Sequence, residues 1–275
     1  TISMIIRDIL EKSQKAKLRT EMEIYLAFLL ACSRLDLLGR SEEEIPVEKL
    51  GALQKAWLQI QEGVPVAYLV NTKDFYGRFF YADENVLIPR GETEMLVDWV
   101  KELASSDAAI LEIGTGSGAI AVTLKLENPK YKIMATDVSA EALEVARKNA
   151  ANLGAEVEFI QSDLLESIPE RDFEILVANL PYIGVEKFNF IAENVEKFEP
   201  HVALLGGSDG LDLYRKMFDQ ILRQKRNFKY ILGEIGFCHG ETIKKVCEEK
   251  FPDAEFELRQ DYSGLDRHFM VKNPR

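Results

Sequence analysis

Apolar and polar positions in residues 1–71 follow the spacing of amphipathic helices. Apolar residues recur at steps of three and four in two stretches separated by the polar segment GRSEEEIP. The positions are Ile24, Phe28, Cys32 and Leu35 in the first stretch and Leu50, Leu53, Trp57 and Ile60 in the second. This pattern predicts a small helical bundle, and because it contains no chemical motif, we expect it to serve packing or substrate docking.

Residues 72–90 have a different character and predict a linking β-hairpin. Aromatic residues cluster around Gly77, and the polar segment ADEN separates the apolar runs RFFY and VLI. Apolar runs divided by a short polar segment are typical of a hairpin.

From residue 91 to 275, short apolar runs alternate with helical patterns, which predicts an α/β domain. The strand-like runs are AAILEIG, YKIMATD, VEFIQSD, FEILVANLP, KYILGEIG, AEFELRQD and RHFMVKN. Alternating strands and helices predict a doubly wound, mostly parallel sheet of seven strands, with ligands at the carboxyl ends of the strands. The last connection is too short for a helix, so the last strand should be antiparallel.

Charge and composition narrow the classes of partner. The chain has 275 residues with 34 basic and 46 acidic side chains, a net charge of −12. This acidity disfavours direct binding to nucleic acid, whose affinity comes largely from Lys and Arg. It suits a small-molecule or protein substrate better.

Cysteine and histidine usage indicates a cytoplasmic protein without a metal. Cys32, Cys238 and Cys247 form no disulfide framework and no C-x-x-C pair, and the three histidines are scattered. No apolar run approaches the roughly 20 residues that span a membrane, and the first residues do not resemble a signal peptide.

A glycine-rich segment follows the first strand of the predicted sheet. It consists of Glu112, Ile113, Gly114, Thr115, Gly116, Ser117 and Gly118. A dinucleotide fold normally shows G-x-G-x-x-G, and an acid beside the loop would repel a pyrophosphate but would favour a cationic ligand. A purely structural turn is the alternative for this stretch alone.

Acids also end the next two strands. Asp137 lies 21 residues after Gly116, close to the offset at which an acid binds ribose hydroxyls, although it could instead cap the following helix. Asp163 ends the third strand and could accept from an adenine amino group. Three acids at consecutive strand ends fit one ligand with a cationic centre, a ribose and an adenine, which is S-adenosylmethionine.

The fourth strand ends in Asn179-Leu180-Pro181-Tyr182, which by itself predicts only a turn. Together with the segments LIPRGETE, ATDVSAEALEVARKNA, FEPHVALLGGSDGLDLYR and DYSGLDR, it makes the chain resemble the glutamine N5-methyltransferases of peptide chain release factors. These enzymes belong to the class I S-adenosylmethionine-dependent methyltransferases.

The resemblance implies roles for individual residues. Gly114 to Gly118 would wrap the methionine part of the cofactor near Glu112, Asp137 would hold the ribose, and Asp163 with Leu164 the adenine. Asn179, which would also lie against the cofactor, and the carbonyl of Leu180 would accept hydrogen bonds from the target amide. Pro181 and Tyr182 would complete the catalytic motif, and Tyr182 would pack on the amide plane.

Two further residues are assigned to the substrate side by the resemblance. Arg90 and Glu92 of the PRGETE segment would line the pocket near the target glutamine. The alternative for Glu92 is a favourable position at a helix start, where acids suit the helix dipole. Glu199-Pro200 and Gly206-Gly207 fit either a loop that closes over the substrate or a structural turn.

The resemblance implies methyl transfer to the glutamine of the Gly-Gly-Gln loop in class 1 release factors, with S-adenosylhomocysteine as the other product. The family usually has proline at position 180, and Leu180 is shared with RNA adenine dimethyltransferases. Methylation of an exocyclic adenine amine in RNA or DNA is therefore the alternative. A nicotinamide-dependent oxidoreductase lacks support, and a scaffold without catalysis is disfavoured because the motifs are intact.

Overall fold

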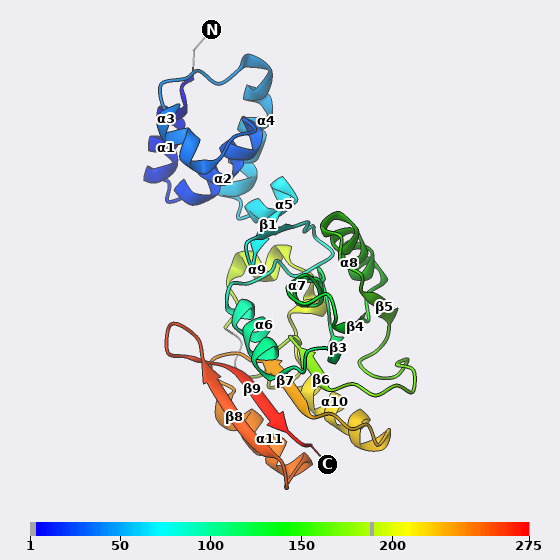
Figure 1. The fold of residues 1–275 in the computed structure, drawn as a ribbon. Helices are drawn as coiled ribbons and strands as arrows, with labels where there is room; N and C mark the ends of the chain where they lie inside the picture. The colour runs from blue at the N-terminus through cyan, green and yellow to red at the C-terminus, as the bar shows by residue number, and fades with distance from the viewer. Residues whose placement is uncertain (1–3, 188–189, 275) are drawn as a thin grey trace. The chain divides into compact units, whose positions relative to one another are not determined.

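The structure is a computed structural model that describes residues 4–187 and 190–274. The chain divides into two compact units, Thr1–Thr72 and Lys73–Arg275, shown as ribbons in Figure 1. Each unit has its own hydrophobic core, so each is described by itself.

The first unit is a helical bundle. Its helices are α1 (Ile6–Lys15), α2 (Arg19–Leu29), α3 (Arg34–Gly39), α4 (Val47–Gln61) and α5 (Val66–Val70). The second predicted stripe is confirmed in α4, where Leu53 and Ile60 are buried. Burial of such side chains, at about 25 cal/mol per Å² of apolar surface, is what holds short helices together.

The first predicted stripe is wrong in phase. The chain leaves the helical conformation after Leu29, so residues 24–35 are not one helix. Phe28 is 56% exposed and Leu35 is 79% exposed, whereas Met22 and Leu26 are fully buried. A stretch that is apolar nearly all round does not reveal from spacing alone which side faces the core.

A hairpin is present within residues 72–90, but its turn precedes the expected one. Strands β1 (Lys73–Phe75) and β2 (Arg78–Phe80) pair around Tyr76 and Gly77, both of which have positive φ. Two residues with positive φ are typical of the tight turns that join antiparallel strands. The run VLI at 86–88 is not a strand.

The rest of the second unit is a seven-stranded sheet with helices on both faces. The strands are β3 (Ala109–Ile113), β4 (Lys132–Asp137), β5 (Glu158–Gln161), β6 (Ile175–Ala178), β7 (Tyr230–Glu234), β8 (Glu255–Gln260) and β9 (Asp266–Lys272). The helices are α6 (Glu92–Leu103), α7 (Ala119–Glu127), α8 (Ala140–Leu153), α9 (Glu193–Phe198), α10 (Asp212–Arg223) and α11 (Gly240–Lys250), with a 3-10 turn at His201–Ala203.

The strand order is β5-β4-β3-β6-β7-β9-β8. Strands β3 to β7 are parallel, and β9 runs antiparallel to both of its neighbours. This confirms the predicted doubly wound sheet with an antiparallel last strand. The order reverses between β3 and β6, which is where open α/β sheets bind ligands.

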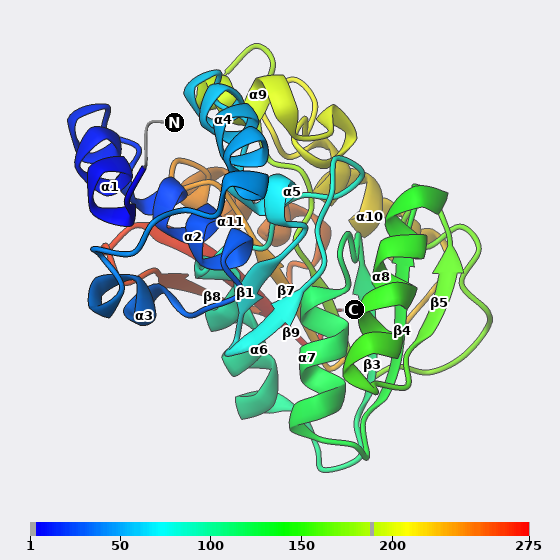
Figure 2. The same ribbon diagram turned by 90° about the horizontal axis from the view of Figure 1, so that it is seen from above.

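Alternate residues of the central strands enter two different cores. Ile175 and Val177 pack with α6 and α7 on one face, and Leu176 and Ala178 pack with α10 and α11 on the other. Figures 1 and 2 show these helices on opposite sides of the sheet. Burial on both faces explains why the parallel strands read as continuous apolar runs.

Candidate active site

A cavity of about 470 Å³ lies where β3, β4 and β6 end. Its volume is in the range of small-molecule sites. Of the predicted site residues, the structure brings together Arg90, Glu112, Gly114, Thr115, Gly116, Ser117, Asp137, Asp163, Leu164, Asn179, Leu180 and Pro181 in its lining. Gly118, Tyr182 and Glu92 are not part of the lining.

The glycine loop forms one wall of this cavity, and the positive φ values of its glycines disfavour other residues there. Gly114 has φ +74°, and a Cβ there would lie 3.2 Å from the Leu180 side chain. Gly118 has φ +81° and packs instead against Ala146 of α8, which explains why it lies outside the lining. The loop therefore leaves bare backbone facing the cavity.

Glu112 is buried beneath the loop and holds it to the start of α7. Its Oε2 atom accepts from Thr115 Oγ1 at 2.7 Å and from the Ala121 N–H at 3.1 Å. Burial raises the pKa of the Glu112 carboxyl to about 8, against a usual value of 4.5. The side chain is therefore mostly protonated at neutral pH when nothing cationic is bound.

We expect the raised pKa of Glu112 to make the free protein less stable as pH increases. The unfolded carboxyl loses its proton near pH 4.5 and the folded one only near pH 8, so stability falls between these values. Glu112→Gln should abolish this decline, which amounts to roughly 3 kcal/mol between pH 5.5 and 8.5. Urea unfolding of both proteins at pH 5.5 and 8.5 measures it. Equal pH dependence would contradict the assignment.

Asp137 joins the glycine loop to the end of β4. Its Oδ2 accepts from the Gly116 N–H at 2.9 Å and its Oδ1 accepts from the Ser139 N–H at 3.0 Å. Burial raises the pKa of this carboxyl above its ordinary value. Ser139, not Asp137, caps α8, since Ser139 Oγ accepts from the Ala142 N–H at 3.0 Å. The carboxylate is thus available at the cavity.

The end of β5 supplies a polar and an apolar side chain. Asp163 is exposed, and Lys216 Nζ lies 2.6 Å from its Oδ2. Leu164 is buried and has φ +54°, a left-handed conformation that costs about 1–3 kcal/mol in a non-glycine residue. Leu164 is among the residues that line the cavity.

A buried polar cluster, formed by Thr93 and Glu234, contacts the residues that follow β6. Asn179 Nδ2 donates to Thr93 Oγ1 at 3.2 Å, and Thr93 Oγ1 donates to Glu234 Oε2 at 2.6 Å. The Tyr182 hydroxyl lies 3.4 Å from Glu234 Oε1, and burial raises its pKa. The fully buried Tyr214 hydroxyl lies 2.6 Å from the Glu234 carbonyl and 3.2 Å from the Ala178 carbonyl. Its single hydrogen is shared between these two acceptors, which ties the ends of β7 and β6 together.

The GGSDG segment packs directly on Asn-Leu-Pro-Tyr. Gly206 N–H donates to the Ile183 carbonyl at 2.8 Å, and Ile183 N–H donates to the Leu204 carbonyl at 2.9 Å. A Cβ at Gly206 would collide with the Pro181 carbonyl, and one at Gly210 would collide with that of Tyr182. These glycines serve close backbone approach, which favours the structural account of this segment.

Gly210→Ala is expected to lower the free energy of unfolding by roughly 2–4 kcal/mol, since φ is +87° and the new Cβ has no room. Denaturant unfolding measures the loss. Gly154→Ala is the matched control, because Gly154 has φ +74° with no atom within 4 Å of an added Cβ, and should cost about 1 kcal/mol. Equal losses would show that conformation alone decides the effect.

Arg90 and Glu92, the two residues assigned to the substrate, have different environments. Arg90 lines the cavity, but its guanidinium pairs with the buried Glu199 at 2.6 Å, and Glu199 also accepts from the Ile88 N–H at 3.1 Å. Glu92 begins α6 on the surface. Glu199 therefore fixes the position of residues 88–90, which precede α6.

Thr93 and Glu234 were missed as site residues by sequence reasoning. Thr93 stands between the two glutamates of PRGETE, and Glu234 is the last residue of β7. A signal for Thr93 was present, since Thr93, Leu96, Val97 and Val100 form the buried stripe of α6. Most buried threonine hydroxyls have a hydrogen-bond partner, so a threonine on such a stripe suggests one.

Within residues 4–187 and 190–274, no group of three or more His, Cys, Asp or Glu side chains could hold a metal ion. The helices in these ranges are also too short or too polar to cross a membrane.

Known proteins resemble both units of the chain. Residues 91–198 match the family model Methyltransferase small domain, and residues 5–70 match PrmC N-terminal domain. Proteins named release factor glutamine methyltransferase are similar over most of their length. The one from Bacillus anthracis is 38% identical over 89% of each chain. The one from Koribacter versatilis is 35% identical over 96% of this chain and 95% of its own.

Solved structures agree with the fold. A methyltransferase from Pyrococcus furiosus has a TM-score of 0.55 at 16% identity, covering 80% of this chain and 98% of its own. The hMettl16 catalytic domain, solved in complex with a MAT2A 3'UTR hairpin, has a TM-score of 0.57 at 12% identity and covers 74% of this chain and 87% of its own. Likeness at such identities concerns the fold alone, so the RNA in the second structure does not bear on the substrate of this chain.

Proposed function

Because the chain belongs to the family of release factor glutamine methyltransferases, we propose that it methylates the side-chain amide nitrogen of the Gly-Gly-Gln glutamine in class 1 peptide chain release factors. The observation that carries this function is the position of Asn179. Its amide lines the cavity beside the glycine loop, and its Nδ2 atom is held by Thr93.

S-adenosylmethionine fits the groups that line the cavity. Gly114 and Gly116 present backbone that leaves room for a ligand, Asp137 presents a carboxylate for a ribose diol, and Leu164 presents an apolar side chain for adenine. Glu112 can lose its proton when a cationic group binds nearby, because the positive charge offsets the cost of burial. When bound, the cofactor supplies an electrophilic methyl group on a positively charged sulfur.

The residues of this chain must orient the amide nitrogen of the target glutamine, which is a poor nucleophile. The nitrogen of an amide shares its lone pair with the carbonyl and is therefore a poor nucleophile. Its attack on the methyl group requires the lone pair to be held in line with that group. Asn179 Oδ1 and the Leu180 carbonyl are two acceptors for its two N–H bonds, and they also stabilise the positive charge that develops on nitrogen. Leucine supplies this carbonyl as well as proline does.

Tyr182 contributes a flat surface and not a base. Its hydroxyl is buried against Glu234, and burial raises its pKa, so it stays protonated. We therefore assign it to packing on the amide plane, beside Pro181. The positive charge on the product nitrogen makes its proton acidic, so it can leave after transfer without a strong base.

Adenine methylation is not favoured, because the full-length relatives named above are glutamine methyltransferases and the net charge is −12. The test compares both substrates. The chain is incubated with labelled S-adenosylmethionine and either a class 1 release factor or structured RNA, and mass spectrometry locates the methyl group. We expect it on the Gly-Gly-Gln glutamine. Methylated adenine beside an unmodified glutamine would reject the proposal.

A further inference from the structure

A chain of three polar side chains leads from the buried end of β7 to the cavity. Glu234 is 1% exposed and Thr93 is 5% exposed, and Asn179 lies at the cavity surface. The two hydrogen bonds that connect them measure 2.6 Å from Thr93 Oγ1 to Glu234 Oε2 and 3.2 Å from Asn179 Nδ2 to Thr93 Oγ1. In sequence, Thr93 is 141 residues from Glu234 and 86 from Asn179.

The hydrogens in this chain of contacts all point the same way. A carboxylate has no hydrogen to give, so the hydroxyl of Thr93 must donate to Glu234. The lone pairs of the same hydroxyl then face Asn179, and only the NH2 side of its amide can satisfy them. The amide of Asn179 is thereby prevented from turning over, and its oxygen is the atom left for a ligand.

Three further polar side chains lie close to Glu234. The Tyr182 hydroxyl donates to its other oxygen at 3.4 Å, and His268 Nε2 from β9 lies 3.6 Å from Oε2. Arg267, also on β9, adds a positive charge nearby. Because Glu234 is a buried acceptor at one end, it fixes the donor and acceptor roles in both hydrogen bonds of the chain.

From this arrangement we propose that Thr93 and Glu234 are positioning residues that determine which end of the Asn179 amide meets the substrate. They present its oxygen, so the site selects a target side chain that carries NH2 and rejects a carboxylate. Thr93 and Glu234 then determine the selection of glutamine over glutamate without contacting the substrate themselves, because they act through Asn179. This inference rests on the proposed function, since it assumes that a glutamine amide enters the site.

The competing account is that Thr93 only ties α6 to β7. Both accounts expect Thr93→Val to lower stability, because Glu234 loses a donor in each case. They differ in substrate preference. Without the hydroxyl, the Asn179 amide can present either end, so a glutamate side chain should gain affinity relative to glutamine. A simple tether has no such effect.

The experiment measures binding of two forms of a class 1 release factor, with the Gly-Gly-Gln glutamine intact or replaced by glutamate. Calorimetry in the presence of S-adenosylhomocysteine gives both dissociation constants without turnover. We expect the unaltered enzyme to prefer the glutamine form at least tenfold. Thr93→Val and Glu234→Gln should each reduce this preference at least fivefold, while the affinity for S-adenosylhomocysteine changes less than threefold.

Two control variants separate positioning from general damage. Thr93→Ser keeps the hydroxyl and should retain most of the preference. Thr123→Val makes the same replacement in α7, at a buried threonine whose hydroxyl makes no hydrogen bond with any residue that the structure describes, and should retain the preference in full. Unchanged affinity for S-adenosylhomocysteine shows that each variant is folded.

The outcomes distinguish the inference from the function on which it rests. A preference that survives in Thr93→Val, or is lost equally in Thr93→Ser, would overturn the positioning role alone. An unaltered enzyme that modifies no glutamine would overturn the proposed function, and the inference with it. Loss of preference in Thr93→Val with rescue by serine supports both.

Discussion

Asn179→Ala is expected to lower kcat by about 10²–10³-fold, the loss typical of removing one preorganised polar contact from a reaction that develops charge. The truncated side chain can no longer accept from the target amide, so the nitrogen lone pair loses its direction. Thr93 would lose its contact at 3.2 Å, but the glycine loop and Asp137 would keep theirs. The affinity for S-adenosylhomocysteine should therefore change less than about threefold, which single-turnover kinetics and calorimetry together can establish.

Leu180→Met is the matched control at the neighbouring position. It preserves volume and leaves the main-chain carbonyl in place, so turnover should fall only a few-fold. Leu180 is 3% exposed and packs against the glycine loop, and larger changes there would disturb that loop. If Asn179→Ala instead abolished cofactor binding while kcat at saturation was retained, the assignment of Asn179 to the substrate would be wrong.

Asp137→Ala should weaken cofactor binding by about 10²–10⁴-fold, because hydrogen bonds to a charged group contribute roughly 1.5–3 kcal/mol each and a ribose diol makes two. The Gly116 N–H would also lose its acceptor, which loosens the loop. Helix α8 should remain intact, since Ser139 caps it. Calorimetric titration with S-adenosylhomocysteine measures the affinity, and circular dichroism measures the helix.

Asp163→Ala is the comparison for this prediction. Asp163 is exposed and already pairs with Lys216, so its removal should weaken binding no more than about tenfold. An unchanged affinity in Asp137→Ala would mean that Asp137 serves only the two N–H groups that it binds in the structure.

Much of the fold could be predicted because its signals are local. Each parallel strand is a short apolar run, and each except β5 is followed by a helical pattern. The short link between β8 and β9 implied an antiparallel strand. The phase of the helical stripe in residues 21–35 could not be predicted, because nearly every side of that stretch is apolar. The hairpin turn was also missed, since the turn at Tyr76-Gly77 lacks the polar letters of ADEN.

The cavity could be predicted from residues that end neighbouring parallel strands, because such ends meet at one edge of the sheet. The contact between Thr93 and Glu234 behind the cavity could not be predicted, since nothing in the sequence pairs two residues 141 positions apart. The protonation state of Glu112 could not be predicted from the sequence. Glu112 was expected simply as a negative group, whereas its burial lets it keep a proton until pH 8 or so.

The position of β9 has a consequence for the order in which the protein folds during synthesis. Strand β8 is made before β9, yet β9 lies between β7 and β8, as Figure 1 shows. A ribosome therefore releases β8 with no neighbour to pair with, and it must wait for β9 before it can join the sheet. Glu234 pairs in register with His268 of β9, so the buried polar groups around Glu234 come together only after β9 has been synthesised.

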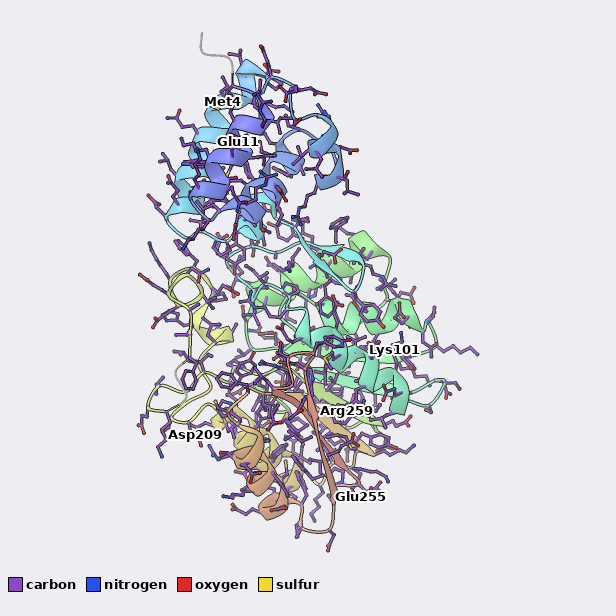
Figure 3. The ribbon with its side chains drawn as sticks, turned by 90° about the vertical axis from the view of Figure 1, so that its left-hand side faces the viewer. Met4, Glu11, Lys101, Asp209, Glu255 and Arg259 are labelled. Atoms are coloured by element: carbon purple, nitrogen blue, oxygen red, sulfur yellow. The ribbon has the colours of Figure 1, made fainter. Side chains whose placement is uncertain are left out.

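The waiting β8 also needs protection from other chains, since an unpaired strand edge can recruit them. Its alternate Glu255, Glu257 and Arg259 provide charges along that edge, which Figure 3 shows at Glu255 and Arg259.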